Sequence, residues 1–247
     1  MSAFLAVLER ELRAVFVSPL AYVVLTFVLL ANGFIFWTLI SHLSDPAVAG
    51  AIAPMQLFFG GTILFWLLAI AVPPLLTMRL VSEEYRSGTI EPLMTAPVTA
   101  GQVVVAKYLS ALAFYAFLWL PSLLYAALLA RHGRVDWGPV ASGMLGVLLV
   151  GALLLAIGVV ASSLARNQIV AAVIAVAAIL LLFMLVFFEQ LTTDETLRAV
   201  IGYVSPVLHM EELAKGIVDT RRLVFYPTAI GLLLFLSARI LATRQWR

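Results

Sequence analysis

Residues Val140–Phe188 read VASGMLGVLLVGALLLAIGVVASSLARNQIVAAVIAVAAILLLFMLVFF, and this stretch decides the class of fold. It holds two uncharged apolar runs, Val140–Leu164 and Ile169–Phe188, which are separated only by Ala165–Gln168. A helix that crosses the hydrocarbon core of a bilayer needs about 20 apolar residues. The stretch therefore predicts two transmembrane helices joined by a tight turn.

The rest of the chain has the same character. Hydrophobic residues make up 64% of the sequence and charged residues 11%, whereas soluble domains are about 45–50% apolar and about 25% charged. Soluble monomers avoid the large apolar surface that this excess would create. The sequence therefore predicts an all-α polytopic membrane protein with one domain over residues 1–247. We expect six transmembrane helices, at about residues 20–40, 57–78, 109–130, 140–164, 169–188 and 223–241.

The first of these runs and the distribution of charge predict the topology. Leu20–Ile40 is longer than the roughly 7–15 apolar residues of a signal peptide, so we interpret it as a retained anchor. Placing the N-terminus inside puts most of the Lys and Arg residues of the flanking loops on the inner side. We therefore expect a multi-pass protein of the bacterial cytoplasmic (inner) membrane with both termini in the cytoplasm.

Smaller features refine the expected helices. Pro73-Pro74 and Pro121 remove backbone donors inside two spans and predict kinks there. Ahead of the first span, apolar residues recur at helical spacing, with charged residues on the other faces. This segment is either a helix lying in the membrane interface or an ordinary helical lead-in to the span. Its apolar residues are Phe4, Leu8, Leu12 and Val15.

The expected spans contain no Asp, Glu, Lys, Arg or His, and the chain has no cysteine and no phosphate-binding loop motif. Ion-coupled carriers and intramembrane enzymes usually need such groups. We therefore predict a non-catalytic chain that binds no metal or cofactor. Asn32 either contacts a substrate or forms an interhelical hydrogen bond. His209, near Glu211 and Glu212, belongs either to a metal pair or, as we favour, to a solvated cluster.

A charged segment at residues 79–107 separates the second and third expected spans. It includes EEYRSGTIEPLMTAPV at Glu83–Val98, in which Gly88 can end a helix. Ile90, Leu93 and Met94 then form the apolar face of a predicted short helix. Thr99 and Gln102 fit a capping box that starts the next helix. The short helix either docks into a groove of a soluble partner or belongs to a hairpin loop that only sets topology.

Glu83–Val98, followed by Lys107, resembles the signature loop of ABC-2 type exporter permeases, roughly E-x-x-x-G-T-[IL]-E-x-L-[LM]-x-[AST]-P-[VI]. Ser162–Gln168 resembles the tight loop after the fourth span of that family, and Tyr203–Arg221 resembles its outer segment between the last two spans. Within the family, the chain is most similar to the gliding-motility-associated branch. A relation to the nitrous-oxide maturation permeases is a second interpretation.

The resemblance implies a type V exporter-like permease fold with an N-terminal interfacial helix and re-entrant outer helices at residues 189–222. It also implies partners: two copies of an ABC ATP-binding subunit, which hold ATP and Mg²⁺, and a second permease copy or a paralogue. The lipid bilayer and a periplasmic or membrane accessory subunit complete the set, with no nucleic acid. The expected contacts with the ATP-binding subunits are Glu83, Glu84, Arg86, Gly88, Thr89, Ile90, Glu91, Leu93, Met94, Arg166 and Asn167. The expected outer gate comprises Pro206, His209, Glu211, Glu212 and Lys215.

Three hypotheses for function follow. The first is a permease subunit that couples ATP hydrolysis by a separate subunit to export or to conformational work. The second is a permease that transports nothing and drives a periplasmic partner by the same coupling. The third is a membrane scaffold that works without an ATPase. The spans lack the wide polar path that exporters of large polymers need, so the sequence predicts no particular substrate.

Overall fold

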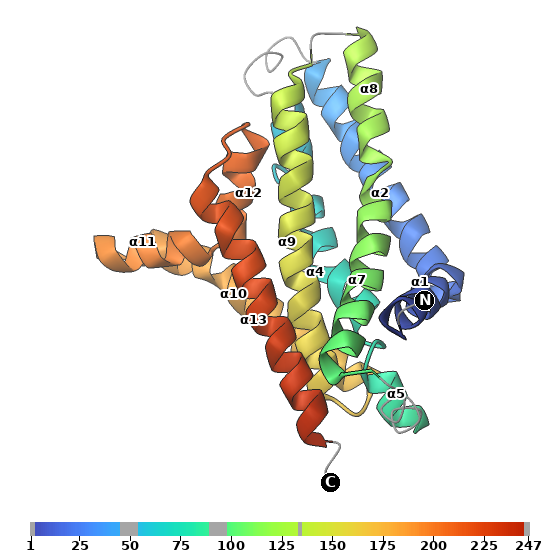
Figure 1. The fold of residues 1–247 in the computed structure, drawn as a ribbon. Coiled ribbons are helices and arrows are strands. Elements are labelled where there is room, and N and C mark those ends of the chain that lie inside the picture. The colour runs from blue at the N-terminus through green and yellow to red at the C-terminus, as the bar shows by residue number, and fades with distance from the viewer. Residues whose placement is uncertain (1–2, 45–53, 89–97, 133–134, 245–247) are drawn as a thin grey trace.

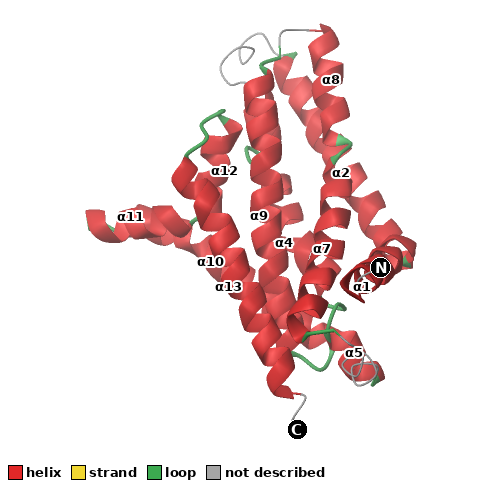
Figure 2. Cartoon of the chain, viewed as in Figure 1, coloured by secondary structure: helices red, strands yellow, loops and turns green. Residues whose placement is uncertain are grey.

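The computed structural model describes residues 3–44, 54–88, 98–132 and 135–244, and all the regular structure in these ranges is helical (Figures 1 and 2). Six stretches of the described residues are long and apolar enough to cross a membrane. The predicted all-α polytopic fold is thereby confirmed. The spans are formed by α2 (Pro19–Leu43), α4 (Ile63–Thr77) with α5 (Ser82–Ser87), α7 (Ala100–Trp119) with α8 (Ser122–His132), α9 (Trp137–Leu164), α10 (Gln168–Leu191) and α13 (Thr220–Arg244). The remaining helices are α1 (Ala3–Val17), α3 (Pro54–Phe58), α11 (Glu195–Val204) and α12 (Pro206–Ala214).

Helix α9 forms the centre of the bundle, with α4, α7, α10, α12 and α13 packed around it (Figure 1). Glycines on α9 allow two of these neighbours to approach closely. A Cβ atom added to Gly151 would lie 2.1 Å from Cε1 of Tyr115 on α7, and one added to Gly158 would lie 2.0 Å from Oγ1 of Thr77 on α4. Small residues allow the same close approach of helices in other membrane proteins.

The second span begins later than predicted. Gly60 has a φ of +93°, which ends helical continuity after α3. The hydroxyl oxygen of Thr62 then accepts a hydrogen bond from the backbone N–H of Phe65 at 3.3 Å and caps the new helix. The long helix therefore starts at Ile63 instead of residue 57, because a local glycine turn interrupts an otherwise continuous apolar run.

The third span is longer than predicted and is broken. The capping box of Thr99 and Gln102 is confirmed, and α7 starts directly after it at Ala100, as predicted. The stretch that can cross a membrane also begins at Ala100, whereas the predicted span began at residue 109. The helix ends at Trp119 and α8 begins at Ser122, which places a break at Pro121, as predicted. The last span, α13, is also longer than the predicted residues 223–241.

Helix α1 is separate from the first span. Ser18 has an extended backbone (φ −65°, ψ 132°) between the two helices, and Pro19 is the first residue of α2. Helix α1 packs against α7 instead of continuing α2, so it is no simple lead-in to the span. Its Phe16 ring meets the Phe114 ring edge to face, with centroids 5.1 Å apart.

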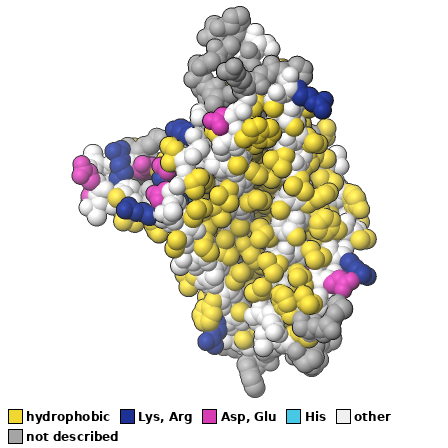
Figure 3. All heavy atoms as spheres, turned by 45° about the horizontal axis from the view of Figure 1, so that its top comes forward, with side chains coloured by type: hydrophobic (Ala, Val, Ile, Leu, Met, Phe, Trp, Pro, Cys, Tyr) yellow, Lys and Arg dark blue, Asp and Glu magenta, His cyan; other side chains and the backbone are white. Residues whose placement is uncertain are grey.

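A broad hydrophobic surface covers the middle of the molecule, and charged side chains gather at its edges (Figure 3). Helix α10 contributes many exposed apolar side chains, including Val173, Leu181 and Phe187, each more than 60% exposed. A surface of this kind is stable only against lipid or another apolar partner. Inside the bundle, Asn32 is 1% exposed, and its Oδ1 has no hydrogen-bond partner among the described residues. The predicted interhelical bond is therefore not made through that atom.

Candidate coupling site

The chain turns sharply after α4, and side chains from distant helices hold this corner. Ser162 on α9 places its Oγ 3.1 Å from the backbone nitrogens of both Val81 and Ser82, which donate to it. The same hydroxyl donates to the backbone oxygen of Met78 at 3.3 Å. Val81 and Ser82 are fully buried, so a single hydroxyl satisfies two N–H groups that water cannot reach.

A second contact joins the corner to the tight turn between α9 and α10. The Nε of Arg79 donates to Oε1 of Gln168 at 3.0 Å. In the same turn, Oδ1 of Asn167 accepts from the backbone N–H of Ile169 at 2.8 Å and caps α10. Arg166 and Asn167 are exposed on this turn. The two loops that were predicted to contact an ATP-binding subunit therefore lie at the same end of the bundle.

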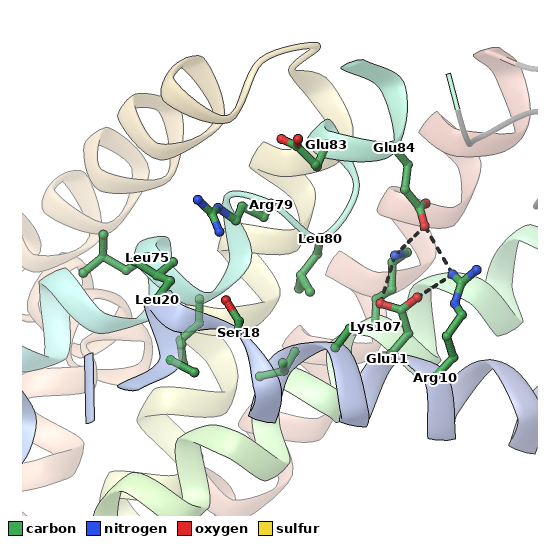
Figure 4. A pocket seen from close by; sticks show the side chains of 14 residues that line it. Arg10, Glu11, Ser18, Leu20, Leu75, Arg79, Leu80, Glu83, Glu84 and Lys107 are labelled. Atoms are coloured by element: carbon green, nitrogen blue, oxygen red, sulfur yellow. Dashed lines mark hydrogen bonds and ion pairs between the residues drawn. The ribbon is translucent and has the colours of Figure 1, made fainter. Parts of the chain in front are cut away.

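The third contact is an ion cluster in which Glu11, Glu84 and Lys107 are largely buried and the Arg10 side chain is 54% exposed (Figure 4). The ammonium nitrogen of Lys107 on α7 lies 2.8 Å from Oε1 of Glu84 on α5 and 3.1 Å from Oε2 of Glu11 on α1. A terminal nitrogen of Arg10 lies 2.6 Å from Oε1 of Glu11 and 3.3 Å from Oε1 of Glu84. Only 3% of the Lys107 side chain and 9% of the Glu11 side chain are exposed.

The ion cluster joins three helices that are far apart in the sequence. Its two carboxylates and two cations balance in formal charge, and such pairing is what allows ionised groups to be buried. Removing one partner from a buried pair typically destabilises a protein by about 3–5 kcal/mol, because the other charge is left uncompensated. Helix α5 is thus fixed to α1 and α7 by charge and to α9 by hydrogen bonds, and Arg79, which precedes it, is hydrogen-bonded to α10.

The structure describes part of the predicted contact set. Gly88 has a φ of +72° and ends α5, as predicted. Glu83 and Arg86 pair on the surface, with 2.9 Å between the carboxylate and guanidinium atoms. Glu84 instead points inward to Lys107, so its carboxylate is an internal link within this chain. Thr89, Ile90, Glu91, Leu93 and Met94 lie outside the described residues.

Glu11 is a member of the ion cluster that sequence reasoning missed. It lies on the same helical face as Phe4, Leu8 and Val15, at spacings of four, three and four residues. A carboxylate in the middle of an apolar stripe needs a cation nearby if that stripe is buried. The periodicity therefore indicated that Glu11 needs a cation partner, and the fold identifies that partner as Lys107.

The outer segment forms two short helices, α11 and α12, which meet at Ser205 and Pro206. Helix α11 projects sideways from the bundle, and α12 lies alongside α9 (Figure 1). A Cβ atom added to Gly146 of α9 would lie 2.9 Å from the sulfur of Met210, so α12 packs closely against an apolar span. This placement fits helices that enter the membrane region without crossing it.

His209 was predicted to belong to a solvated cluster, and that prediction is wrong. The side chain is fully buried because this face of α12 packs against α13, with Nδ1 3.1 Å from the hydroxyl oxygen of Tyr226. Burial, reinforced by the Arg222 guanidinium, lowers the pKa of His209 to about 4. Glu212 pairs with Arg222, while Glu211 and Lys215 are exposed. No group of three or more possible metal ligands occurs within the described ranges.

A family model described as "ABC-2 family transporter protein" matches residues 46–213, well over half of the chain. The chain belongs to the ABC-2 transporter family. The match includes the α4–α5 corner of this ABC-2 protein and three of the four helices attached to it, namely α7, α9 and α10. Helix α1, with Arg10 and Glu11, lies outside the match. No curated protein matches the sequence.

Proposed function

We propose that this chain is the permease subunit of an ATP-binding cassette transporter and that α5, with the loop after it, receives motion from a separate ATP-binding subunit. The observation that carries the proposal is the attachment of the α4–α5 corner to four other helices. Ser162 joins it to α9, Gln168 to α10, Lys107 to α7 and Glu11 to α1. Force applied at such a corner moves much of the bundle, whereas a free loop would absorb it.

Burial explains why the attachment transmits motion. Packed interiors and paired buried charges rearrange between discrete arrangements and do not deform continuously. Helix α5 is short, and its Glu84 is held by Lys107, which lies directly on the third span. A displacement of α5 therefore has to move α1 and α7 with it or break buried ion pairs.

The assembly follows from the same proposal. Two ATP-binding subunits would hold ATP and Mg²⁺ and dock at residues 83–94 and at Arg166 and Asn167. A second copy of the chain or a paralogue would complete the membrane part. We place this assembly in the bacterial cytoplasmic membrane, with both termini in the cytoplasm and α11 and α12 near the outer surface. Similarity to the gliding-motility-associated branch belongs to this proposal as well.

A specific observation favours a second candidate function, in which the chain drives a periplasmic partner and transports nothing. Helix α11 projects sideways from the bundle and exposes apolar side chains, including Leu197 and Val200 at 48% and 57% exposure. Helix α12 is joined to α13 by the Arg222–Glu212 ion pair and by His209 with Tyr226. Motion of the last span would therefore move the outer segment, which could act on a partner.

Co-expression with the ATP-binding subunit encoded nearest to the gene tests the proposal. The two chains should co-purify from detergent, and the membrane chain should change the ATPase rate of its partner. Failure of every neighbouring ATP-binding subunit to co-purify would favour the scaffold hypothesis instead. If the complex forms, an outer partner that is released only during ATP turnover would select the second candidate.

A further inference from the structure

A cleft of about 390 Å³ lies between the α1–α2 corner and the α4–α5 corner (Figure 4). Its volume falls within the ~300–1,000 Å³ range of small-molecule sites. Apolar side chains of three helices line the part nearest the membrane spans: Val15 on α1, Leu20 on α2, and Leu75 and Leu76 on α4. Beyond the end of α4 the lining is charged and begins with Arg79. The cleft therefore changes from apolar to charged along the direction in which a lipid changes from acyl chain to headgroup.

The charged groups around the cleft leave one cation without a carboxylate. The ion cluster is neutral, because its two carboxylates balance its two cations. Glu83 also lines the cleft, and Arg86 neutralises it at 2.9 Å on the surface of α5. Arg79 makes no ion pair with a described carboxylate, although its side chain lines the same cleft. These groups together carry a formal charge of +1, which is complementary to a ligand with one negative charge.

The Arg79 guanidinium is held in place by a distant helix. Its Nε donates to Oε1 of Gln168 on α10 at 3.0 Å, and its two terminal nitrogens have no hydrogen-bond partner among the described residues. Figure 4 shows the guanidinium on the same side of the cleft as Leu75 and Leu20, away from the ion cluster. A guanidinium with both terminal nitrogens free can donate two parallel hydrogen bonds to the oxygens of one phosphate. Its position beside the apolar lining is the one that the phosphate of a lipid needs.

We infer that this cleft binds an anionic phospholipid through Arg79. The phosphodiester accepts hydrogen bonds from the terminal nitrogens of Arg79, and the acyl chains cover Leu20, Leu75 and Leu76 before they continue into the bilayer. The ammonium group of a zwitterionic headgroup finds no free partner here, because each carboxylate that lines the cleft already has a cation beside it. Free phosphate would leave the apolar lining uncovered. The inference goes beyond the proposed function and needs no ATP-binding subunit.

Native mass spectrometry of the purified full chain, titrated with phosphatidylglycerol or phosphatidylcholine of identical acyl chains, tests this. Phosphatidylglycerol should be retained about fivefold more strongly, the factor that one basic residue gives for an anionic lipid. Inorganic phosphate should not displace it, because phosphate cannot cover the apolar lining. Equal retention of the two lipids, retention of neither, or displacement of phosphatidylglycerol by inorganic phosphate would overturn the inference.

Variants of Arg79 and a matched control locate the site. Arg79→Gln should abolish the preference for phosphatidylglycerol over phosphatidylcholine, whereas Arg79→Lys keeps the charge and should keep most of the preference. Arg239→Gln is the control, because Arg239 lies near the end of α13 at the same end of the bundle as α5 and stacks 5.0 Å over the Phe235 ring instead of lining the cleft (Figure 1).

An equal loss of preference in Arg239→Gln and Arg79→Gln would show only a general attraction of arginines to anionic lipid and would contradict the assignment. If Arg79→Gln does not fold, Gln168→Ala takes its place. That variant removes the hydrogen bond that orients the Arg79 guanidinium, so it should lower the preference for phosphatidylglycerol. An unchanged preference in a folded Gln168→Ala chain would count against the site.

Discussion

The ammonium group of Lys107 on α7 lies 2.8 Å from a carboxylate oxygen of Glu84 on α5 and is almost completely buried. This pair fixes α5, which precedes the loop that was predicted to receive an ATP-binding subunit, to the third span. Glu11 shares the same ammonium from α1 at 3.1 Å, so one cation links three helices. The geometry makes Lys107 the residue whose loss should affect the coupling site most.

Replacing Lys107 with Met should leave Glu11 and Glu84 buried with Arg10 as their only cation partner among the described residues. We expect a loss of about 3–5 kcal/mol in stability, measured as a lower midpoint of thermal unfolding in detergent. Arg13→Gln is the matched control, since its exposed ion pair with Glu9 contributes about 0–1 kcal/mol. Adding Glu84→Gln to Lys107→Met should restore part of the loss. Equal midpoints for Lys107→Met and Arg13→Gln would show that the cluster carries no such energy.

Ser162→Ala should destabilise the α4–α5 corner by about 1–3 kcal/mol, because two buried N–H groups lose their acceptor. Ser163 offers an adjacent control of the same chemistry. It is equally buried, but its hydroxyl donates only to the backbone oxygen of Val159 in its own helix. Hydrogen exchange at Val81 and Ser82 should rise in Ser162→Ala and stay unchanged in Ser163→Ala. Similar exchange in both variants would contradict the role assigned to Ser162.

The central helix gives a packing prediction. Gly151→Ala places a Cβ atom 2.1 Å from the Tyr115 ring, and overpacking of this kind costs about 1–3 kcal/mol. Gly231→Ala on α13 is the matched control, because nothing lies within 4 Å of the added atom. That control should be neutral or slightly stabilising, since alanine favours helix by about 1 kcal/mol over glycine. Thermal unfolding of both variants, with Tyr115→Leu added to rescue the first, checks the contact.

These contacts also show what the sequence could predict. The six membrane-spanning helices could be predicted from the long apolar runs, because length and composition decide whether a helix can cross a bilayer. The capping box at Thr99 was also predictable, because both of its residues lie within one turn. The start of α4 was missed, although Gly60-Gly61 is a turn signal and Thr62 a helix cap within the apolar run. The burial of Glu11 and His209 depends on which helices become neighbours, and that information is tertiary.

His209 gives a prediction for pH. Its pKa of about 4 in the folded protein lies below the value of an unperturbed histidine, about 6.5. Between these values the unfolded chain binds the proton and the folded chain does not, so stability should fall as the pH drops from 6.5 toward 4. His209→Gln should flatten this part of the unfolding profile. His42→Gln, at an exposed position on α2, should leave it unchanged; an unaltered profile in His209→Gln would contradict the assignment.

The final prediction tests docking at the loop after α5 and rests on the sequence of that loop. If Leu93 inserts into a groove of an ATP-binding subunit, Leu93→Asp buries an unpaired carboxylate there, which costs several kcal/mol by desolvation. A micromolar interface, stabilised by about 8 kcal/mol, would then largely dissociate. Position 93 lies outside every span predicted from the sequence, so the membrane bundle should remain folded and inserted. Glu91→Gln should weaken binding less, because an exposed ion pair contributes only about 0–1 kcal/mol. A folded Leu93→Asp chain that still retains and stimulates the ATP-binding subunit would show that this loop sets topology alone.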